Sequence, residues 1–280
     1  MSASILWKTV HPVDLNRITE ARVQSHWAVQ ILSALADACI PAEADDSHTN
    51  LGWRSDLEAL VGRETPDGYH LTLKIPHLTI SLLDSFGKEF ASLPLSGKTL
   101  EESLQWLDGV VTRFTGRSMD RKPKLRDYEM PDHPVGNGAA FDRQDPDAFQ
   151  ELANWFHNSF ALLDAVLEWE EDATLARCWP HHFDVGALLS MGVPYDFAQS
   201  IGLGWSPGDS SYSEPYWYVN PYPNPDPPPE EALPSGGHWH REGWFGAVLR
   251  GSAVWDNPKG QDQRCREFID AALKIEKALY

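Results

Sequence analysis

The sequence of 280 residues has little cysteine and no long apolar run. Its three cysteines, Cys39, Cys178 and Cys265, are far apart and form no CxxC pair, which indicates reduced thiols rather than a disulfide framework. Nothing approaches the roughly 18 consecutive apolar residues of a membrane-spanning helix. Residues 1–10 lack an apolar core followed by a small-residue cleavage site, so we expect no secretory signal. These absences predict a cytoplasmic protein without a membrane partner.

Positive charge is also scarce. Lys and Arg number 23 against 41 Asp and Glu, which gives a net charge of −18 with histidines neutral. A surface of this sign repels phosphate backbones, so we expect no nucleic-acid partner. The same excess favours solubility, and it leaves the oligomeric state open.

Motifs that name a reaction are missing too. The chain has no Gly-x-Ser-x-Gly elbow of a serine hydrolase and no Walker loop. The segment Gly202-Leu203-Gly204 lacks the third glycine and the following helix of a dinucleotide fingerprint. The sequence therefore leaves open whether the protein is an enzyme.

Hydrophobic periodicity predicts an α+β fold, an antiparallel sheet with flanking helices. Helical spacing of apolar residues predicts helices over 15–38, 99–116, 147–172 and 261–280, and a capping box, Thr99 with Glu102, marks the start of the second. Alternating apolar and polar residues predict strands over 57–63, 69–75, 77–84 and 89–95, followed by shorter extended runs over 185–189, 202–205 and 216–220. The proline-rich segment 221–234 is predicted to be neither helix nor central strand.

The order helix, strands, helix occurs twice along the chain. We therefore predict a single domain, 1–280, with two pseudo-equivalent helix-meander-helix halves, 1–116 and 147–280, packed about one cleft. An irregular segment, 117–146, joins them. Amphipathic helices often share a residue pattern without common descent, so chance similarity is the alternative to a true duplication.

The densest group of metal-binding or proton-transferring side chains lies in Arg177–Asp184, Arg-Cys-Trp-Pro-His-His-Phe-Asp. Neighbours in an extended segment point to opposite faces, so His182 and Asp184 are predicted to share a face while His181 points away. A histidine beside a carboxylate can move protons. Two histidines and a carboxylate also suit non-haem iron or hydrolytic zinc. The alternative is a hydrogen bond between His182 and Asp184 that only fixes a turn.

Three further residues are candidates for the same site. His238 and His240 share a face by the same alternation, and Glu214 lies in an aromatic run, Tyr212–Tyr222, where burial would raise a carboxyl pKa. The predicted catalytic residues are therefore His182, Asp184 and Glu214. The predicted metal ligands are His182, Asp184, His238 and His240, with iron or zinc as the metal.

Two more histidines are left open. His26 lies opposite the apolar stripe of the first helix, which indicates either solvent exposure or a polar cavity. His48 lies in a polar loop, 42–53, whose aspartates Asp45 and Asp46 suit either a turn cap or a bound cation.

Four motifs resemble a family of bacterial proteins of unknown function. They are Asp-Asp-Ser-His-Thr-Asn-Leu-Gly-Trp at 45–53, Cys-Trp-Pro-His-His-Phe-Asp at 178–184, Ser-Pro-Gly-Asp at 206–209 and Glu-Pro-Tyr-Trp-Tyr-Val at 214–219. The resemblance extends from the first helix to the last and implies common descent. It implies no substrate, cofactor or catalytic residue.

The sequence thus supports two functional hypotheses. The first is an enzyme for a small molecule, of hydrolase or oxygenase type if a metal is bound, that uses His182 and Asp184 with help from His238, His240 or Glu214. The second is a noncatalytic protein whose aromatic pocket binds a small molecule or a partner protein.

Overall fold

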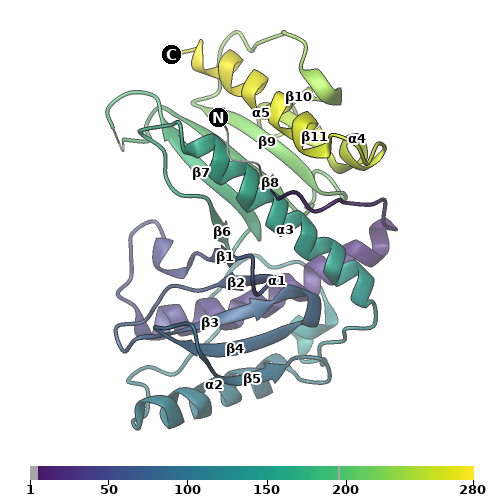
Figure 1. Cartoon of the computed structure of the whole chain (residues 1–280). Coiled ribbons are helices and arrows are strands. Elements are labelled where there is room, and N and C mark those ends of the chain that lie inside the picture. Colours follow the sequence, from purple (N-terminus) through teal and green to yellow (C-terminus); the bar gives the residue numbers. More distant parts are fainter. Residues whose placement is uncertain (1–5, 195) are drawn as a thin grey trace. The chain divides into compact units, whose positions relative to one another are not determined.

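The structure is a computed structural model that describes residues 6–194 and 196–280 (Figure 1). Residues 1–5, half of the segment on which the absence of a secretory signal was predicted, lie outside the described residues. Within the described residues, five α-helices flank two antiparallel sheets of five and six strands. The predicted α+β fold is confirmed.

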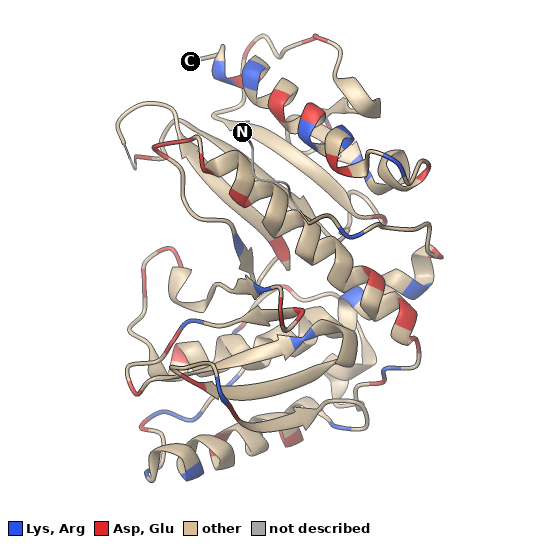
Figure 2. Cartoon of the chain, in the orientation of Figure 1, with Lys and Arg blue, Asp and Glu red and all other residues tan. Residues whose placement is uncertain are grey.

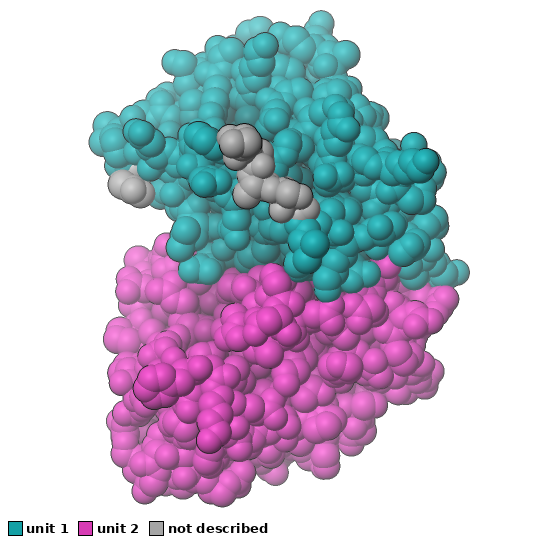
Figure 3. Space-filling view, viewed as in Figure 1, with its two compact units in different colours: residues 1–15, 154–177, 184–280 teal, residues 16–153, 178–183 magenta. Residues whose placement is uncertain are grey.

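The chain forms two compact units, coloured separately in Figure 3. Unit 1 comprises residues 1–15, 154–177 and 184–280, and unit 2 comprises residues 16–153 and 178–183. The irregular segment 117–146, predicted to join two halves, belongs to unit 2. Descent of the two helix-sheet-helix halves from one duplicated ancestor stays a prediction.

Unit 2 contains a five-stranded meander with two flanking helices. The strands pair in chain order, and the elements are α1 (Leu15–Cys39), β1 (Gly52–Arg54), β2 (Ala59–Val61), β3 (Tyr69–Lys74), β4 (Thr79–Asp84), β5 (Glu89–Pro94) and α2 (Leu100–Thr115). The predicted capping box starts α2, because Thr99 Oγ1 accepts from the amide of Glu102 while the Glu102 carboxylate accepts from the amide of Thr99. The Phe114 ring of α2 packs edge-on against Tyr69 and Phe90 of the sheet.

Helix α1 is buried on its polar face as well as its apolar one. The predicted stripe that includes Ala28 and Ile31 is fully buried, and so are His26 and Gln30 on the opposite side. His26 is 7% exposed, so the expectation of a solvent-facing polar side is wrong. A polar side chain in such a place needs a hydrogen-bond partner, which for both residues is the carbonyl of Pro180.

Unit 1 contains the six-stranded sheet, in the order β10-β11-β9-β8-β7-β6. Its elements are α3 (Pro146–Leu167), β6 (Arg177–Trp179), β7 (Asp184–Ser190), β8 (Ser200–Ser206), β9 (Tyr216–Tyr222), β10 (His238–His240), β11 (Gly246–Arg250), α4 (Gly251–Trp255) and α5 (Gln261–Lys277), with α3 and β6 beginning or ending in unit 2. The extended runs predicted over 185–189, 202–205 and 216–220 are confirmed as β7, β8 and β9. The second sheet is not a simple meander, because β11 lies between β9 and β10.

One prediction about proline needs correction. Pro221 lies inside β9, opposite Ile201 of β8. Strand β11 pairs with residues 216–219 of β9 and does not reach Pro221. On the side of β9 that faces β11, Pro221 therefore has no strand partner, and the missing N–H of proline breaks no hydrogen bond of the sheet there.

The core of unit 1 is rich in tryptophan. Trp155 of α3 stacks on Trp205 of β8, with ring centroids 6.1 Å apart, and both rings are fully buried together with Trp217 of β9. Helix α5 contributes Phe268 and its apolar neighbours to the same core. These three of the chain's 12 tryptophans thus serve packing against this sheet.

Acidic residues are distributed over the helices and loops of both units, with fewer Lys and Arg among them (Figure 2). Among the helices of the described residues, none combines the length and the apolar character that crossing a membrane requires.

Candidate functional site

The predicted pairing of His182 with Asp184 rested on an extended backbone that the chain does not have. Residues 180–183 form a turn between β6 and β7, and the amide of His182 donates to the carbonyl of Trp179. Strand alternation therefore does not apply. The rings of His181 and His182, predicted to point apart, lie beside each other with centroids 4.2 Å apart.

Helix α1 holds this turn through its buried polar side. His26 Nε2 and Gln30 Nε2 both donate to the carbonyl of Pro180, at 2.9 and 2.7 Å, and the His26 ring stacks on Phe183 at 5.2 Å. Burial, reinforced by the charges of Arg22 and the two turn histidines, lowers the pKa of His26 to about 4. His26 is thus a neutral donor to the main chain, and its role at the turn is structural.

The two histidines of the turn, His181 and His182, have different surroundings. Burial lowers the pKa of His181 to about 4, and its ring lies 5.6 Å from that of Tyr128. His182 is exposed. The charge of Asp46 acts on His181, and the pairing of His182 with Asp184 stays a prediction.

The polar loop in unit 2 is tied down by its own contacts. The Asp45 carboxylate accepts from the amide of Ser47, and Asp46 forms an ion pair with Arg126 at 2.7 Å. His48 Nδ1 accepts from the amide of Glu43. These contacts match the turn-capping alternative for this loop.

Unit 1 does bring two predicted residues together. The Tyr212 hydroxyl lies 3.1 Å from His238 Nε2 and 2.8 Å from His240 Nδ1. His238 and His240 share a face of β10, as strand alternation predicts. All three side chains are half-buried and thus reachable from solvent. Tyr212, His238 and His240 are called the Tyr–His–His cluster below.

The partners of His240 assign the protons in the cluster. His240 Nε2 lies 2.7 Å from the carbonyl of Glu242, which can only accept, so Nε2 carries the proton and neutral His240 has a bare Nδ1. Tyr212 therefore donates to His240. The Tyr212 oxygen is then free to accept from the Nε2–H of His238, which leaves the lone pair of His238 on Nδ1.

Electrostatics favour the neutral forms of His238 and Tyr212. Burial, helped by the charge of Arg250 and by His240, lowers the pKa of His238. Burial also raises the pKa of the Tyr212 phenol, with Arg250 opposing and Asp209 adding to the shift. The Arg250 guanidinium lies 5.8 Å over the Tyr212 ring. At neutral pH the chain of hydrogen bonds from His238 to Tyr212 is therefore built from uncharged groups.

Two tyrosine–aspartate pairs continue from the cluster. Tyr216 donates to Asp209 at 2.5 Å and Tyr218 donates to Asp184 at 2.6 Å, while the Tyr212, Tyr216 and Tyr218 rings follow one another at 4.8 and 6.2 Å. Burial and the carboxylates raise the pKa of both donors. Asp184 thus orients a tyrosine, which its position in the sequence did not indicate.

A glycine on β8 makes room for the last tyrosine of this row. A Cβ at Gly204 would lie 2.4 Å from the Tyr218 hydroxyl. Such a Cβ would also lie 2.3 Å from the carbonyl oxygen of Val185. Glycine is therefore required by the close approach of the neighbouring strand and of the phenol rather than by a special backbone conformation.

Glu214 has a structural partner on each oxygen. One oxygen accepts from the amide of Ser252 in the first turn of α4, at 2.6 Å, and the other lies 3.6 Å from Arg250. A carboxylate at a helix start satisfies an amide that has no partner inside the helix. The contacts thus place Glu214 at the N-terminal end of α4, and its predicted catalytic role stays a prediction.

The predicted metal ligands are not gathered as one group. Among the described residues, no three His, Cys, Asp or Glu side chains come together in a way that could hold a metal ion. The residue that the sequence reasoning missed is Tyr212. It lies in the aromatic run Tyr212–Tyr222, in the loop between β8 and β9. The pairing of β11 with both β9 and β10 brings that loop to the histidines.

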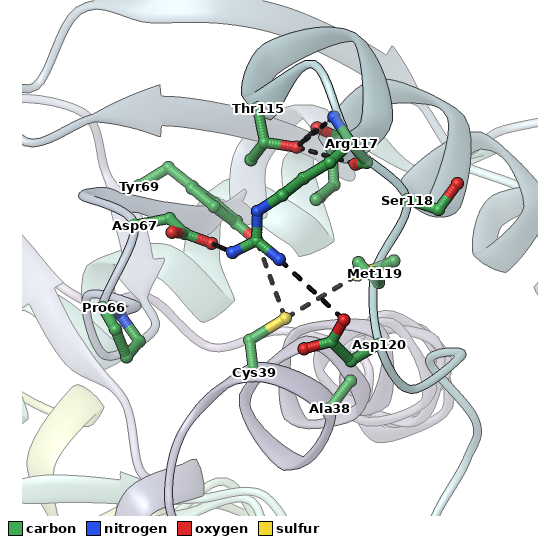
Figure 4. A pocket seen from close by; sticks show the side chains of 11 residues that line it. Ala38, Cys39, Pro66, Asp67, Tyr69, Thr115, Arg117, Ser118, Met119 and Asp120 are labelled. Carbon is green, nitrogen blue, oxygen red and sulfur yellow. Dashed lines mark hydrogen bonds and ion pairs between the residues drawn. The ribbon is translucent and has the colours of Figure 1, made fainter.

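Unit 2 has a separate cavity of about 140 Å³ between α1, β3 and the end of α2 (Figure 4). Cys39 Sγ lies 3.6 Å from the Tyr69 hydroxyl and 3.7 Å from Met119 Sδ. Arg117 crosses the opening to Asp67 at 2.6 Å, with Asp120 at 4.0 Å on its other side. Burial raises the pKa of the Cys39 thiol, so it stays protonated at neutral pH.

Comparisons with known proteins add no family to this geometry. No protein-family model matches the chain, and no curated protein and no solved structure matches it. The bacterial family whose motifs the chain resembles stays a prediction.

Proposed function

We propose that the protein is a cytoplasmic enzyme that transfers protons on a small molecule at the Tyr–His–His cluster. The observation that supports this function best is the single hydroxyl of Tyr212 hydrogen-bonded to two half-buried imidazoles. Histidine titrates nearest to neutral pH, and a positioned acid or base contributes about 10²- to 10⁴-fold to a rate. The proposal keeps His238 and His240, which were predicted as metal ligands, and puts Tyr212 in the place of the predicted catalytic residues His182, Asp184 and Glu214.

The hydrogen-bond order gives a direction to the proton. His238 Nδ1 carries the lone pair and takes a proton from the substrate. The Nε2–H of His238 then passes to the Tyr212 oxygen, as the phenolic proton passes to Nδ1 of His240. The Glu242 carbonyl accepts from the other nitrogen of the resulting imidazolium and keeps the ring oriented.

The test compares turnover in wild type and Tyr212→Phe. Each protein is incubated with a bacterial metabolite extract, and consumed compounds are identified by untargeted mass spectrometry. We expect a compound that wild type consumes at least 100-fold faster than the variant. Tyr222→Phe is the matched control, because Tyr222 is 61% exposed at the end of β9. Equal consumption by wild type and Tyr212→Phe, or no consumption by either, would refute the proposal.

A noncatalytic binding protein is the second candidate, and the cavities of unit 2 favour it. Besides the cavity in Figure 4, a cavity of about 350 Å³ lies between Arg17, Gln24 and Phe149. The larger one is within the size range of small-molecule sites. Native mass spectrometry should then show a co-purifying ligand, which Ala38→Leu removes if it occupies the cavity of Figure 4.

A further inference from the structure

The strand register places Arg250 beside the Tyr–His–His cluster, on the same face of the six-stranded sheet. His238 of β10 lies opposite Val248 of β11, and Arg250 is two residues further along β11. Directly opposed residues, and residues two apart on one strand, point to the same face. Arg250 is therefore the diagonal neighbour of His238, within reach of a long side chain. Its guanidinium lies 5.8 Å from the centre of the Tyr212 ring.

The Arg250 guanidinium has hydrogen-bond donors available. Its ion-pair partner among the described residues is the Glu214 carboxylate, and their distance of 3.6 Å is too long for a hydrogen bond. The other Glu214 oxygen already accepts from the amide of Ser252 at 2.6 Å. A guanidinium has five N–H donors, and the Arg250 side chain is 52% exposed. These donors are therefore open to a ligand from solvent.

The charge next to His238 is positive. Arg250 and the neighbouring imidazole of the cluster both lower the pKa of His238, and no carboxylate of the described residues acts on it. The carboxylates of Asp209 and Glu242 act on the Tyr212 phenol instead. The oxygens of Asp209 are taken up by two main-chain amides and a tyrosine hydroxyl. A negatively charged group beside His238 would thus meet a guanidinium that can pair with it.

A carboxylate suits this position better than a phosphate. The planar fork of a guanidinium matches a carboxylate with two parallel hydrogen bonds. Arg250 supplies a single positive charge, which balances a single carboxylate. The net charge of −18 repels an anion of higher charge more strongly.

We infer that Arg250 binds the carboxylate group of a small organic acid and holds that acid beside His238 of the Tyr–His–His cluster. The inference rests on the proposed function for the reaction, because it makes small carboxylic acids the substrate class of the enzyme. Arg250 is then a binding residue, and the proton path through His238, Tyr212 and His240 is unchanged. Binding of the acid is measured without turnover.

The experiment uses the full chain and two matched pairs of probes, lactate with lactamide and benzoate with benzamide. Binding is followed by NMR through the ring C–H signals of isotope-labelled histidine, assigned with His238→Gln and His240→Gln. We expect at least one acid to shift the His238 signal saturably, while the amide of the same skeleton leaves it in place. Arg250→Gln should weaken acid binding at least about 10-fold, the usual effect of losing a charged hydrogen bond.

Three further variants sharpen the test. Glu214→Gln removes the carboxylate that competes for Arg250, so the acid should bind about two- to fivefold more tightly, which a damaged fold would not produce. Arg250→Lys keeps the charge without the planar fork, so its affinity should lie between those of wild type and Arg250→Gln. Arg54→Gln, the matched control, removes an arginine of unit 2 that is 41% exposed and paired with Asp56, and it should bind as wild type does.

The inference is overturned by equal shifts with an acid and its amide, by no shift with either acid, or by unchanged affinity in Arg250→Gln. Circular dichroism confirms that each variant is folded. The proposed function fails separately. Acid binding that depends on Arg250, without turnover of any metabolite, would remove the reaction and keep the binding site. Turnover of a compound without a carboxylate, equal in wild type and Arg250→Gln, would keep the reaction and remove the inferred substrate class.

Discussion

Histidines occur in two clusters that the fold uses in different ways. In unit 2, His26 donates to the carbonyl of Pro180 and stacks on Phe183, so its ring supports a turn. In unit 1, His238 and His240 direct ring nitrogens at a shared hydroxyl. In unit 2 the imidazole of His26 binds the main chain. In unit 1 the imidazoles of His238 and His240 bind another side chain.

The difference shows why density along the chain is a poor guide to chemistry. The segment 177–184 has the closest run of reactive side chains, yet its turn leaves His182 exposed, with its ring beside that of His181. Tyr212 and His240 are 28 residues apart and meet through two strand pairings. A functional cluster therefore depends on register more than on sequence proximity.

The largest difference between the two groups of histidines should be in catalysis. It is measured with the compound that wild type consumes in the test of the proposed function. Tyr212→Phe and His240→Gln should each lower kcat by about 10²- to 10⁴-fold, because each breaks the path of the proton. His182→Ala should change kcat less than about twofold. Steady-state kinetics of the three variants check this. A comparable loss of kcat in His182→Ala would show that His182 takes part in the reaction.

The two units should also respond to pH in opposite directions, first through Glu276 in unit 1. This side chain is 0% exposed, and burial, partly offset by the backbone of Ala247, raises its pKa from 4.5 to about 9. A raised carboxyl pKa means that stability is full below pH 4.5 and falls as pH rises toward 9. The loss is ~3 kcal/mol at pH 7, from ~1.4 kcal/mol per pH unit.

Glu276→Gln keeps the shape and removes the titration. We expect the variant to be more stable than wild type at pH 7, by up to ~3 kcal/mol, and equal to it near pH 4.5. Urea unfolding across this range measures the difference. A constant offset between the two proteins at every pH would contradict the assignment.

Unit 2 should be sensitive to acid through His26. Its pKa is lowered to about 4, whereas an unfolded histidine titrates at 6.5. The unfolded chain therefore binds more protons between these values, and stability is full above pH 6.5 and falls as pH drops toward 4. The expected loss is ~3 kcal/mol, and it should shrink in His26→Gln, which keeps a donor for Pro180. Urea unfolding between pH 4 and 7 checks this; an unchanged slope in the variant would contradict it.

Periodicity predicted elements well and pairings poorly. The helix predicted over 15–38 is α1 at 15–39, because an apolar stripe and a following proline are local signals. The turn at 180–183 was read as extended, since it has no glycine or asparagine and places Phe183 at a φ of 60°. The insertion of β11 between β9 and β10 has no local signal at all.

The candidate site follows the same rule. His238 and His240 were predicted to share a face from their spacing alone, and the structure confirms it. Tyr212 could be named only as part of an aromatic run, because its hydroxyl reaches the histidines of β10 from the loop that precedes β9. The burial of His26 could not be predicted either, since its partner is a carbonyl from a distant turn.

The smallest effect concerns Glu214, which the sequence placed in the catalytic set. Because it accepts from the amide of Ser252 at the start of α4, Glu214→Gln should lower the free energy of unfolding by about 1 kcal/mol, the usual worth of a helix-start contact. Turnover should fall less than about threefold, since Glu214 reaches the cluster only through Arg250. Urea unfolding and kinetics on the same preparation check both values. A 100-fold fall in turnover with unchanged stability would show that Glu214 takes part in the reaction and does not only stabilise the start of α4.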